Sequence, residues 1–109
     1  MGSCRLILDP GVCGFKCEIE AREAGKRRVE ILITSKCDQI CRLNEMLGTL
    51  DLREIFITPN KNRVFFLAEK AGCHASCPIP IGVLKCAEVA LGVALPRGVA
   101  FHFDPSSHS

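Results

Sequence analysis

Residues 15–33 read FKCEIEAREAGKRRVEILI, and this stretch decides the fold. Apolar and charged side chains alternate over residues 15–22 and again over residues 29–33, which is the pattern of strands that bury one face. Ala24-Gly25-Lys26 lies between the two runs and supplies a turn. The stretch therefore predicts an antiparallel hairpin. The buried residues of its first arm would be Cys17, Ile19 and Ala21.

Further strands are expected on both sides of this hairpin. Residues 4–8 alternate in the same way and end at the turn signal Asp9-Pro10-Gly11, so they predict a strand before it. Residues 52–57 are rich in β-branched and aromatic side chains and predict a fourth strand. Residues 99–103 predict a closing strand near the end of the chain.

Three helices are expected after the hairpin. The first covers about residues 36–47, with Ser35 as its cap and apolar residues at helical spacing. The second covers about residues 60–71 and follows Thr58-Pro59, a typical helix start. The third covers residues 78–91 and begins with prolines in its first turn. A glycine follows each predicted helix: Gly48, Gly72 and Gly92.

Together these elements predict an α+β fold, with an antiparallel or mixed sheet and about three helices packed on it. The chain has 109 residues, of which 48% are hydrophobic, enough for one modest core. We therefore expect one domain over residues 1–104 and a polar tail over residues 105–109.

Composition indicates where the chain is located and which partners it does not bind. No run approaches the roughly 18 apolar residues of a membrane span, and no signal peptide is evident, so we expect a cytoplasmic protein without membrane contact. The formal charge is only +2, Trp and Tyr are absent, and the one basic cluster, Lys26-Arg27-Arg28, lies at the hairpin turn. Nucleic-acid binding is not expected from this composition.

Cysteine is the residue type that carries chemistry here. The chain has eight cysteines, six of them in three C-x-x-x-C pairs. A reducing compartment disfavours disulfides and leaves metal binding, redox cycling or burial as the uses of a thiol. The three pairs are Cys13 with Cys17, Cys37 with Cys41, and Cys73 with Cys77.

The eight thiols divide by their expected position in the fold. Cysteines on an inward strand phase or an apolar helix face are expected to fill the core; these are Cys4, Cys17, Cys41 and Cys86. Cysteines in turns or at helix starts suit ligands and nucleophiles; these are Cys13, Cys37, Cys73 and Cys77. Four thiolates would bind zinc or an iron–sulfur cluster. The sequence leaves open whether His74, Cys17 or Cys41 takes part.

Two resemblances bear on function. Cys77-Pro78-Ile79-Pro80, followed by a helix and then by Leu95-Pro96-Arg97-Gly98-Val99, resembles the C-P-x-P segment of the TusA and SirA sulfur-carrier family over residues 72–104. In that family the cysteine at the helix start carries a persulfide and passes its sulfur to a partner protein. By that resemblance Cys77 would be the sulfur-carrying residue.

The chain as a whole also resembles an uncharacterised family of small cysteine-rich proteins. The motifs that carry this resemblance are Cys13-Gly14-Phe15, Ser35-Lys36-Cys37 and His74-Ala75-Ser76-Cys77-Pro78-Ile79-Pro80. The resemblance groups Cys13, Cys37 and Cys77 without naming a reaction.

Three functions therefore remain in view from the sequence. The leading hypothesis is a protein that binds a metal or an iron–sulfur cluster through Cys13, Cys37, Cys73 and Cys77 and transfers electrons to a protein partner. The second is a sulfur-transfer protein in which Cys77 carries a persulfide and Cys73 resolves it. The third is an interaction domain whose cysteines only fill space. Whether the chain is an enzyme stays open, as does a homodimer in which each subunit supplies one ligand pair.

Overall fold

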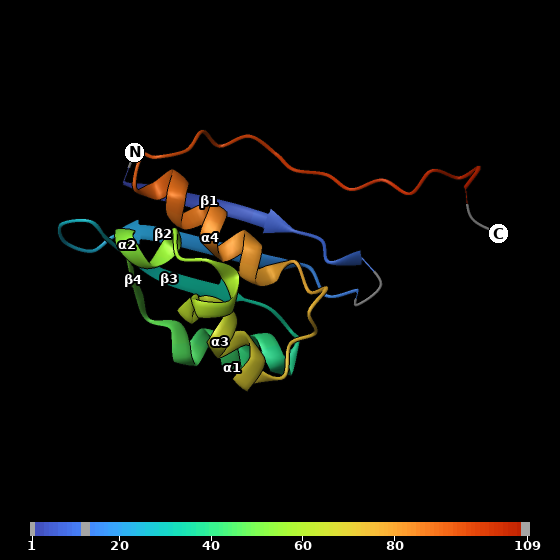
Figure 1. Cartoon of the computed structure of the whole chain (residues 1–109), viewed down its shortest axis with the longest axis horizontal. Helices are drawn as coiled ribbons and strands as arrows, with labels where there is room; N and C mark the ends of the chain where they lie inside the picture. Colours follow the sequence, from blue (N-terminus) through green and yellow to red (C-terminus); the bar gives the residue numbers. More distant parts are fainter. Residues whose placement is uncertain (1, 12–13, 108–109) are drawn as a thin grey trace.

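The hairpin predicted from residues 15–33 forms the centre of a four-stranded antiparallel sheet. The computed structural model describes residues 2–11 and 14–107 (Figure 1). The sheet order follows the chain order. Its strands are β1 (Ser3–Leu8), β2 (Cys17–Glu23), β3 (Arg28–Thr34) and β4 (Thr49–Asp51).

The register of β2 and β3 confirms the predicted burial pattern. Ile19 lies opposite Ile33 and Ala21 lies opposite Ile31, and all four side chains are buried. The turn is closed by the Ala24 N–H, which donates to the Arg28 carbonyl at 2.9 Å. Because side chains alternate across a strand, the opposite face of the sheet carries the charged residues of both strands.

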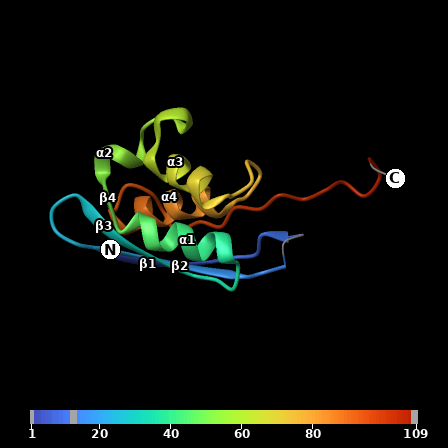
Figure 2. The ribbon, with the colours of Figure 1, turned by 90° about the horizontal axis from the view of Figure 1, so that it is seen from below.

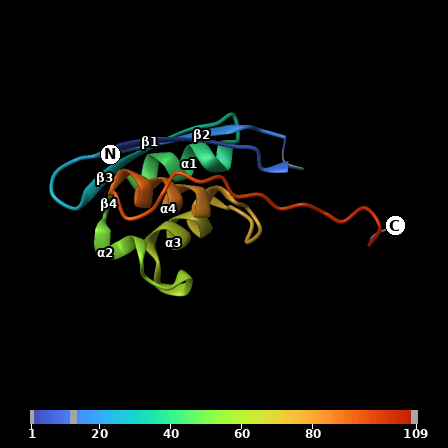
Figure 3. The same cartoon turned by 90° about the horizontal axis from the view of Figure 1, so that it is seen from above.

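The helices of the described residues all lie on one side of this sheet (Figures 2 and 3). The helical segments are α1 (Asp38–Leu47), α2 (Leu52–Ile55), the 3₁₀ turn η2 (Pro59–Lys61), α3 (Arg63–Ala71) and α4 (Ile79–Ala90). Helix α4 packs on β1 and β2, while α1 packs on β3 and α3. The predicted α+β fold, with helices on an antiparallel sheet, is confirmed.

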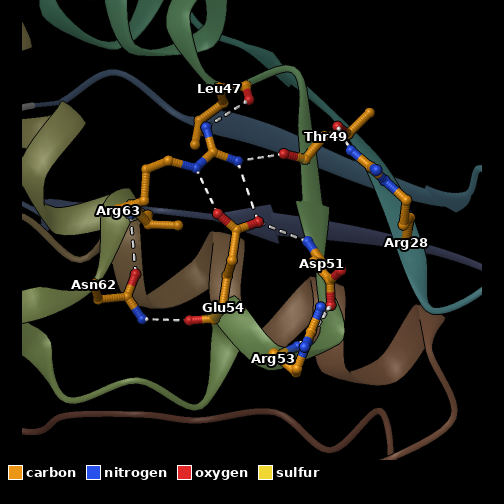
Figure 4. Close-up of polar contacts among 9 residues, drawn as sticks. Arg28, Leu47, Thr49, Asp51, Arg53, Glu54, Asn62 and Arg63 are labelled. Carbon is orange, nitrogen blue, oxygen red and sulfur yellow. Dashed lines mark hydrogen bonds and ion pairs between the residues drawn. The ribbon is translucent and has the colours of Figure 1, made fainter.

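The predicted strand at residues 52–57 is wrong. The Asp51 carboxylate accepts the Arg53 N–H at 2.9 Å, and the Glu54 carboxylate accepts the Asp51 N–H at 2.7 Å. This reciprocal capping box begins the helical turn α2 and overrides the β-favouring side chains that follow (Figure 4). The fourth strand, β4, lies earlier, at Thr49–Asp51.

A second polar network fixes the start of α3 (Figure 4). Asn62 is 1% exposed; its Oδ1 accepts the Val64 N–H at 2.9 Å, and its Nδ2 donates to the Glu54 carbonyl at 3.0 Å. Asn62 therefore caps α3, which begins at Arg63 rather than near residue 60. The Arg63 guanidinium donates to Glu54 Oε1 at 2.7 Å, to the Leu47 carbonyl at 3.3 Å and to the Thr49 carbonyl.

Two other local predictions are corrected by the structure. Ser35 does not cap a helix start: its Oγ accepts the Cys37 N–H at 3.1 Å, and Cys37 itself is the residue before α1. Residues 95–104 form neither a strand nor a bridge with the described part of the chain, so the predicted closing strand at residues 99–103 is wrong. Within residues 2–11 and 14–107, no helix is long and apolar enough to cross a membrane.

Candidate functional site

Three separate parts of the chain bring cysteines to one region beside the core. Cys17 is the first residue of β2, Cys37 is the residue before α1, and Cys73 and Cys77 lie in the turn between α3 and α4. Cys17 is 1% exposed, while the other three are partly buried and pack against the same hydrophobic core. We refer to Cys17, Cys37, Cys73 and Cys77 as the thiol cluster.

The backbone explains why the α3–α4 turn lies beside α1. Gly72 ends α3 in the left-handed region, with φ of 87°, where glycine is favoured. Arg42 of α1 donates to the Ala71 carbonyl at 3.0 Å and so bonds one of the last carbonyls of α3. A Cβ added at Gly72 would lie 3.7 Å from Arg42 and from Gln39. The turn that carries Cys73 is therefore held against the first turns of α1.

The four thiols affect one another electrostatically. Burial raises the pKa of Cys17 to about 11, and the sulfurs of Cys77 and Cys37 add to the shift. Burial likewise raises the pKa of Cys73 to about 11, with further contributions from Cys77 and Cys37. The Cys77 side chain is therefore close enough to Cys73 to raise its pKa. Since such interactions weaken with distance, the cluster is one local group of thiols.

An open hollow of about 380 Å³ lies beside Cys37. Its lining comes mainly from the start of α1: Phe15, Lys36, Cys37, Asp38, Gln39 and Arg42. The Cys37 thiol donates to Gln39 Oε1 at 3.8 Å, a weak contact for a sulfur donor. One member of the cluster is therefore reachable from solvent.

The thiol cluster is not a ready-made site for one ion. Residues 2–11 and 14–107 contain no group of three or more His, Cys, Asp or Glu side chains arranged to hold a metal ion. A tetrahedral zinc site requires four donors within about 2.3 Å of the metal, which also forces the sulfurs close together. The thiols as they lie do not meet that condition.

Three of the four predicted ligands come together in the structure. Cys37, Cys73 and Cys77 belong to the thiol cluster, whereas Cys13 lies outside the described residues and stays a prediction. Cys17 was expected to fill the core, and its part in a site was left open; it is buried, and it also lies beside the other thiols. Its C-x-x-x-C spacing from Cys13 was the sequence signal that could have indicated this. His74 is exposed, and its carbonyl accepts the Cys77 N–H at 3.0 Å.

The remaining thiols lie elsewhere. Cys86 is fully buried, as predicted, and its thiol lies 3.4 Å from the Cys4 carbonyl and 3.5 Å from the Ile19 carbonyl. Burial raises the pKa of Cys86 to about 12, with a hydrogen bond from the Cys4 side chain as the next cause. Cys41 is exposed rather than packed in the core, and its thiol donates to the Ser35 carbonyl at 3.2 Å. Cys4, Cys41 and Cys86 therefore lie outside the thiol cluster.

Comparison with known proteins identifies the relatives of the chain. A family of unknown function, DUF6951, matches residues 4–103. The chain belongs to the DUF6951 family. This confirms the expected membership of an uncharacterised family, and the DUF6951 match spans the sheet, all the helices and every cysteine. The resemblance to TusA and SirA is not shown. No curated protein and no solved structure matches the chain.

Proposed function

We propose that the chain binds a thiophilic metal centre through the thiol cluster. The observation that carries the proposal is that four cysteines from three separate segments lie beside one core at one end of α1 and α4. Thiolates are soft ligands that prefer zinc, copper(I) and iron–sulfur clusters. A bound cation would also offset the cost of ionising several neighbouring thiols in a partly buried place.

An iron–sulfur cluster is the form of metal centre that we favour. A single zinc ion would draw four sulfurs closely together, whereas the iron and sulfide atoms of a cluster lie between the cysteine sulfurs and hold them further apart. Cys17, Cys37, Cys73 and Cys77 would be the ligands. When bound, such a cluster supplies one-electron transfer. The exposed hollow beside Cys37 would then be the side from which a protein partner approaches.

The first test is to purify the protein without oxygen and to determine iron, acid-labile sulfide and zinc together with the visible absorption spectrum. Broad visible absorption with iron and sulfide in matching amounts is the result expected for a cluster. A colourless protein that contains zinc would keep the thiol site and remove electron transfer. A protein that stays metal-free after anaerobic reconstitution with iron and sulfide, and after zinc addition, would overturn the proposal.

Single substitutions then assign the ligands. Cys37→Ser and Cys73→Ser should each lose most of the bound metal, because each removes a thiolate from the cluster. Cys41→Ser is the matched control, since Cys41 is exposed and bonded to the Ser35 carbonyl. Cys17→Ser and Cys13→Ser decide which member of that pair is the fourth ligand. Equal metal content in all five variants would mean that the thiols do not bind it.

Sulfur transfer is the second candidate, and it is favoured because Cys73 and Cys77 lie in the same turn, with Cys77 close enough to raise the pKa of Cys73. The Cys77 thiolate would attack the outer sulfur of a persulfide donor R–S–SH, releasing the thiolate RS⁻ and leaving Cys77 as its persulfide. Attack by the Cys73 thiolate on the inner sulfur would then release HS⁻ and leave a Cys73–Cys77 disulfide. Here Cys73 is oxidised together with Cys77, and the transferred sulfur is reduced.

Mass spectrometry separates the two candidates. After treatment with a small-molecule persulfide, the sulfur-transfer hypothesis predicts a gain of about 32 Da on Cys77 in the Cys73→Ser variant, which lacks the resolving thiol. Adding Cys17→Ser or Cys37→Ser to this variant should keep that gain, because formation of the persulfide needs only Cys77. Absence of the adduct on Cys77 of Cys73→Ser would rule out this second candidate.

A further inference from the structure

The chain ends in an extended segment that has no place in the sheet. Residues 93–107, here called the C-terminal arm, follow α4 and run beyond the other elements to the end of the described chain (Figures 1 and 3). Val99 is 61% exposed and Phe101 is 86% exposed. Exposed aromatic side chains in a regular order are costly in water and typical of interaction segments.

The arm has the sequence pattern of a strand. Val99, Phe101 and Phe103 alternate with Ala100, His102 and Asp104, which places the large apolar side chains on one face of an extended chain. Residues 95–104 nevertheless form no strand or bridge within the described ranges. Pro96 follows Leu95 and disfavours a helical conformation there, so the arm leaves the domain in an extended form. The pattern therefore indicates that the arm can pair, as a strand, with the open edge of a sheet.

An open sheet edge is present at β1. Strand β1 is the first strand of the sheet and pairs only with β2 among the described strands. The Glu23 N–H donates to the Gly2 carbonyl at 2.7 Å, and bonded positions alternate in an antiparallel pair. The backbone groups of Arg5 and Ile7 therefore point toward the open edge. Such a row of backbone groups is a template for a further strand.

The helix-facing side chains of β1 are only partly covered. Leu6 and Leu8 face the helices, yet both are only partly buried. Helix α4 crosses them at Gly82, where an added Cβ would lie 2.8 Å from Leu8 Cδ1 and 3.7 Å from Leu6 Cδ2. A strand added at this edge would place one of its faces beside Leu6 and Leu8. The apolar face of the arm matches that position in character.

We propose that two copies of the chain form a symmetric dimer in which each C-terminal arm adds as a strand to β1 of the other copy. A second copy is the occupant because the arm, after running back along its own domain, continues past the end of the other elements (Figure 1), and because exchange satisfies both arms and both edges at once. Each phenylalanine buries about 150–250 Å², and the two arms together bury four of them, Phe101 and Phe103 of each copy. With an equal area covered on the partner, the interface is about 1,200–2,000 Å², the size of a stable interface.

The test is the molar mass of the full chain in solution, measured by size-exclusion chromatography with light scattering under reducing conditions. We expect twice the 11.9 kDa of one chain at micromolar concentration. Val99→Asp and Phe101→Asp should each yield monomers. Phe66→Asp is the control, because Phe66 is 56% exposed on α3, away from β1. A wild-type chain that is monomeric at every concentration measured would overturn the proposal. This includes a monomer whose arm pairs with its own β1, which hydrogen exchange would reveal as protection of the arm.

A second pair of variants tests the β1 edge directly. Ile7→Pro removes an N–H that points toward the open edge and leaves the β1–β2 bonds at neighbouring positions. It should yield monomers, while Ile7→Thr, which keeps that N–H, should stay dimeric. Circular dichroism of both variants checks that they fold. A dimer that survives Ile7→Pro and Phe101→Asp alike would use another surface, and the proposal would be wrong.

Discussion

Folding changes the acid–base chemistry of the Cys17 and Cys73 thiols. Both side chains leave water and come close to other sulfurs, which disfavours the thiolate. At neutral pH the two groups therefore carry protons in the metal-free protein. Metal binding must displace those protons, so affinity should rise with pH.

A first prediction concerns the stability of the metal-free protein at alkaline pH. The pKa values of Cys17 and Cys73 rise from 9.0 to about 11 on folding, so the folded chain holds more protons than the unfolded chain between these values. The free energy of unfolding should be constant with respect to these thiols below about pH 9 and should fall as the pH rises toward 11. Urea titrations at a series of pH values measure the effect.

Substitution provides the control for that pH dependence. Among the described residues, folding raises the pKa of three thiols: Cys17, Cys73 and Cys86. One of them is gone in Cys17→Ser, so the decline in the urea midpoint between pH 9 and 11 should be shallower than in the wild type. Cys41→Ser should leave the decline unchanged, because Cys41 is exposed. A decline of equal slope in all three proteins would show that other groups cause it.

At the scale of the elements, one arginine connects four of them. The Arg63 guanidinium, on α3, bonds the Glu54 carboxylate of α2, the carbonyl at the end of α1 and a carbonyl of β4 (Figure 4). The same interaction lowers the pKa of Glu54, with the hydrogen bond from Arg63 as the largest cause. Arg63 thus donates hydrogen bonds to the Leu47 and Thr49 carbonyls, which lie at the end of α1 and in β4.

We predict that Arg63→Ala lowers the free energy of unfolding by about 2–3 kcal/mol, since hydrogen bonds to charged groups are each worth about 1.5–3 kcal/mol and partial exposure reduces their sum. Chemical denaturation measures the change. Arg53→Ala is the control: its side chain is 88% exposed and lies 3.9 Å from Asp51, so its loss should cost less than about 1 kcal/mol. Similar losses in both variants would contradict the role of Arg63.

The contact between α4 and the sheet depends on a glycine. A Cβ at Gly82 would lie 2.8 Å from Leu8 Cδ1 and 3.0 Å from Ile19 Cδ1, so both side chains would have to shift. We predict that Gly82→Ala destabilises the domain by about 1–2 kcal/mol, because overpacking outweighs the gain of about 1 kcal/mol in helix propensity. Thermal unfolding measures it. Gly98→Ala, which adds a Cβ in open space, should be close to neutral; a Gly82→Ala protein as stable as the wild type would disprove the close approach.

At the scale of the whole molecule, the thiol cluster joins β2, the start of α1 and the α3–α4 turn. If the cluster binds metal as proposed, binding restrains all three parts at once. We predict that free metal at about 100 times the dissociation constant raises stability by about 2.7 kcal/mol. Differential scanning fluorimetry with and without metal should show a clear rise in Tm in the wild type and in Cys41→Ser, and no rise in Cys37→Ser. A rise of equal size in Cys37→Ser would place the metal elsewhere.

The sequence could predict those parts of the fold that depend on local periodicity. The β2–β3 hairpin, β1, the main part of α1 and α4, and the end of α3 at Gly72 follow from apolar spacing and from glycine at turns. The strand predicted at residues 52–57 was wrong because a capping box at Asp51 outweighed the β propensity of these residues. The strand predicted at residues 99–103 was wrong because a strand forms only where its backbone pairs with a neighbouring strand, and residues 95–104 pair with none of the described strands.

For the candidate site, the sequence by itself determined which chemistry is available: eight cysteines, and the turn positions of Cys37, Cys73 and Cys77. Only the tertiary structure decided which thiols meet. Cys17 joined the cluster because the start of β2 lies beside the α3–α4 turn, whereas Cys41, one helical turn after Cys37, faces solvent. Spacing along the chain sets local geometry, but contacts between distant segments depend on how the helices pack on the sheet, and that packing is a property of the whole core.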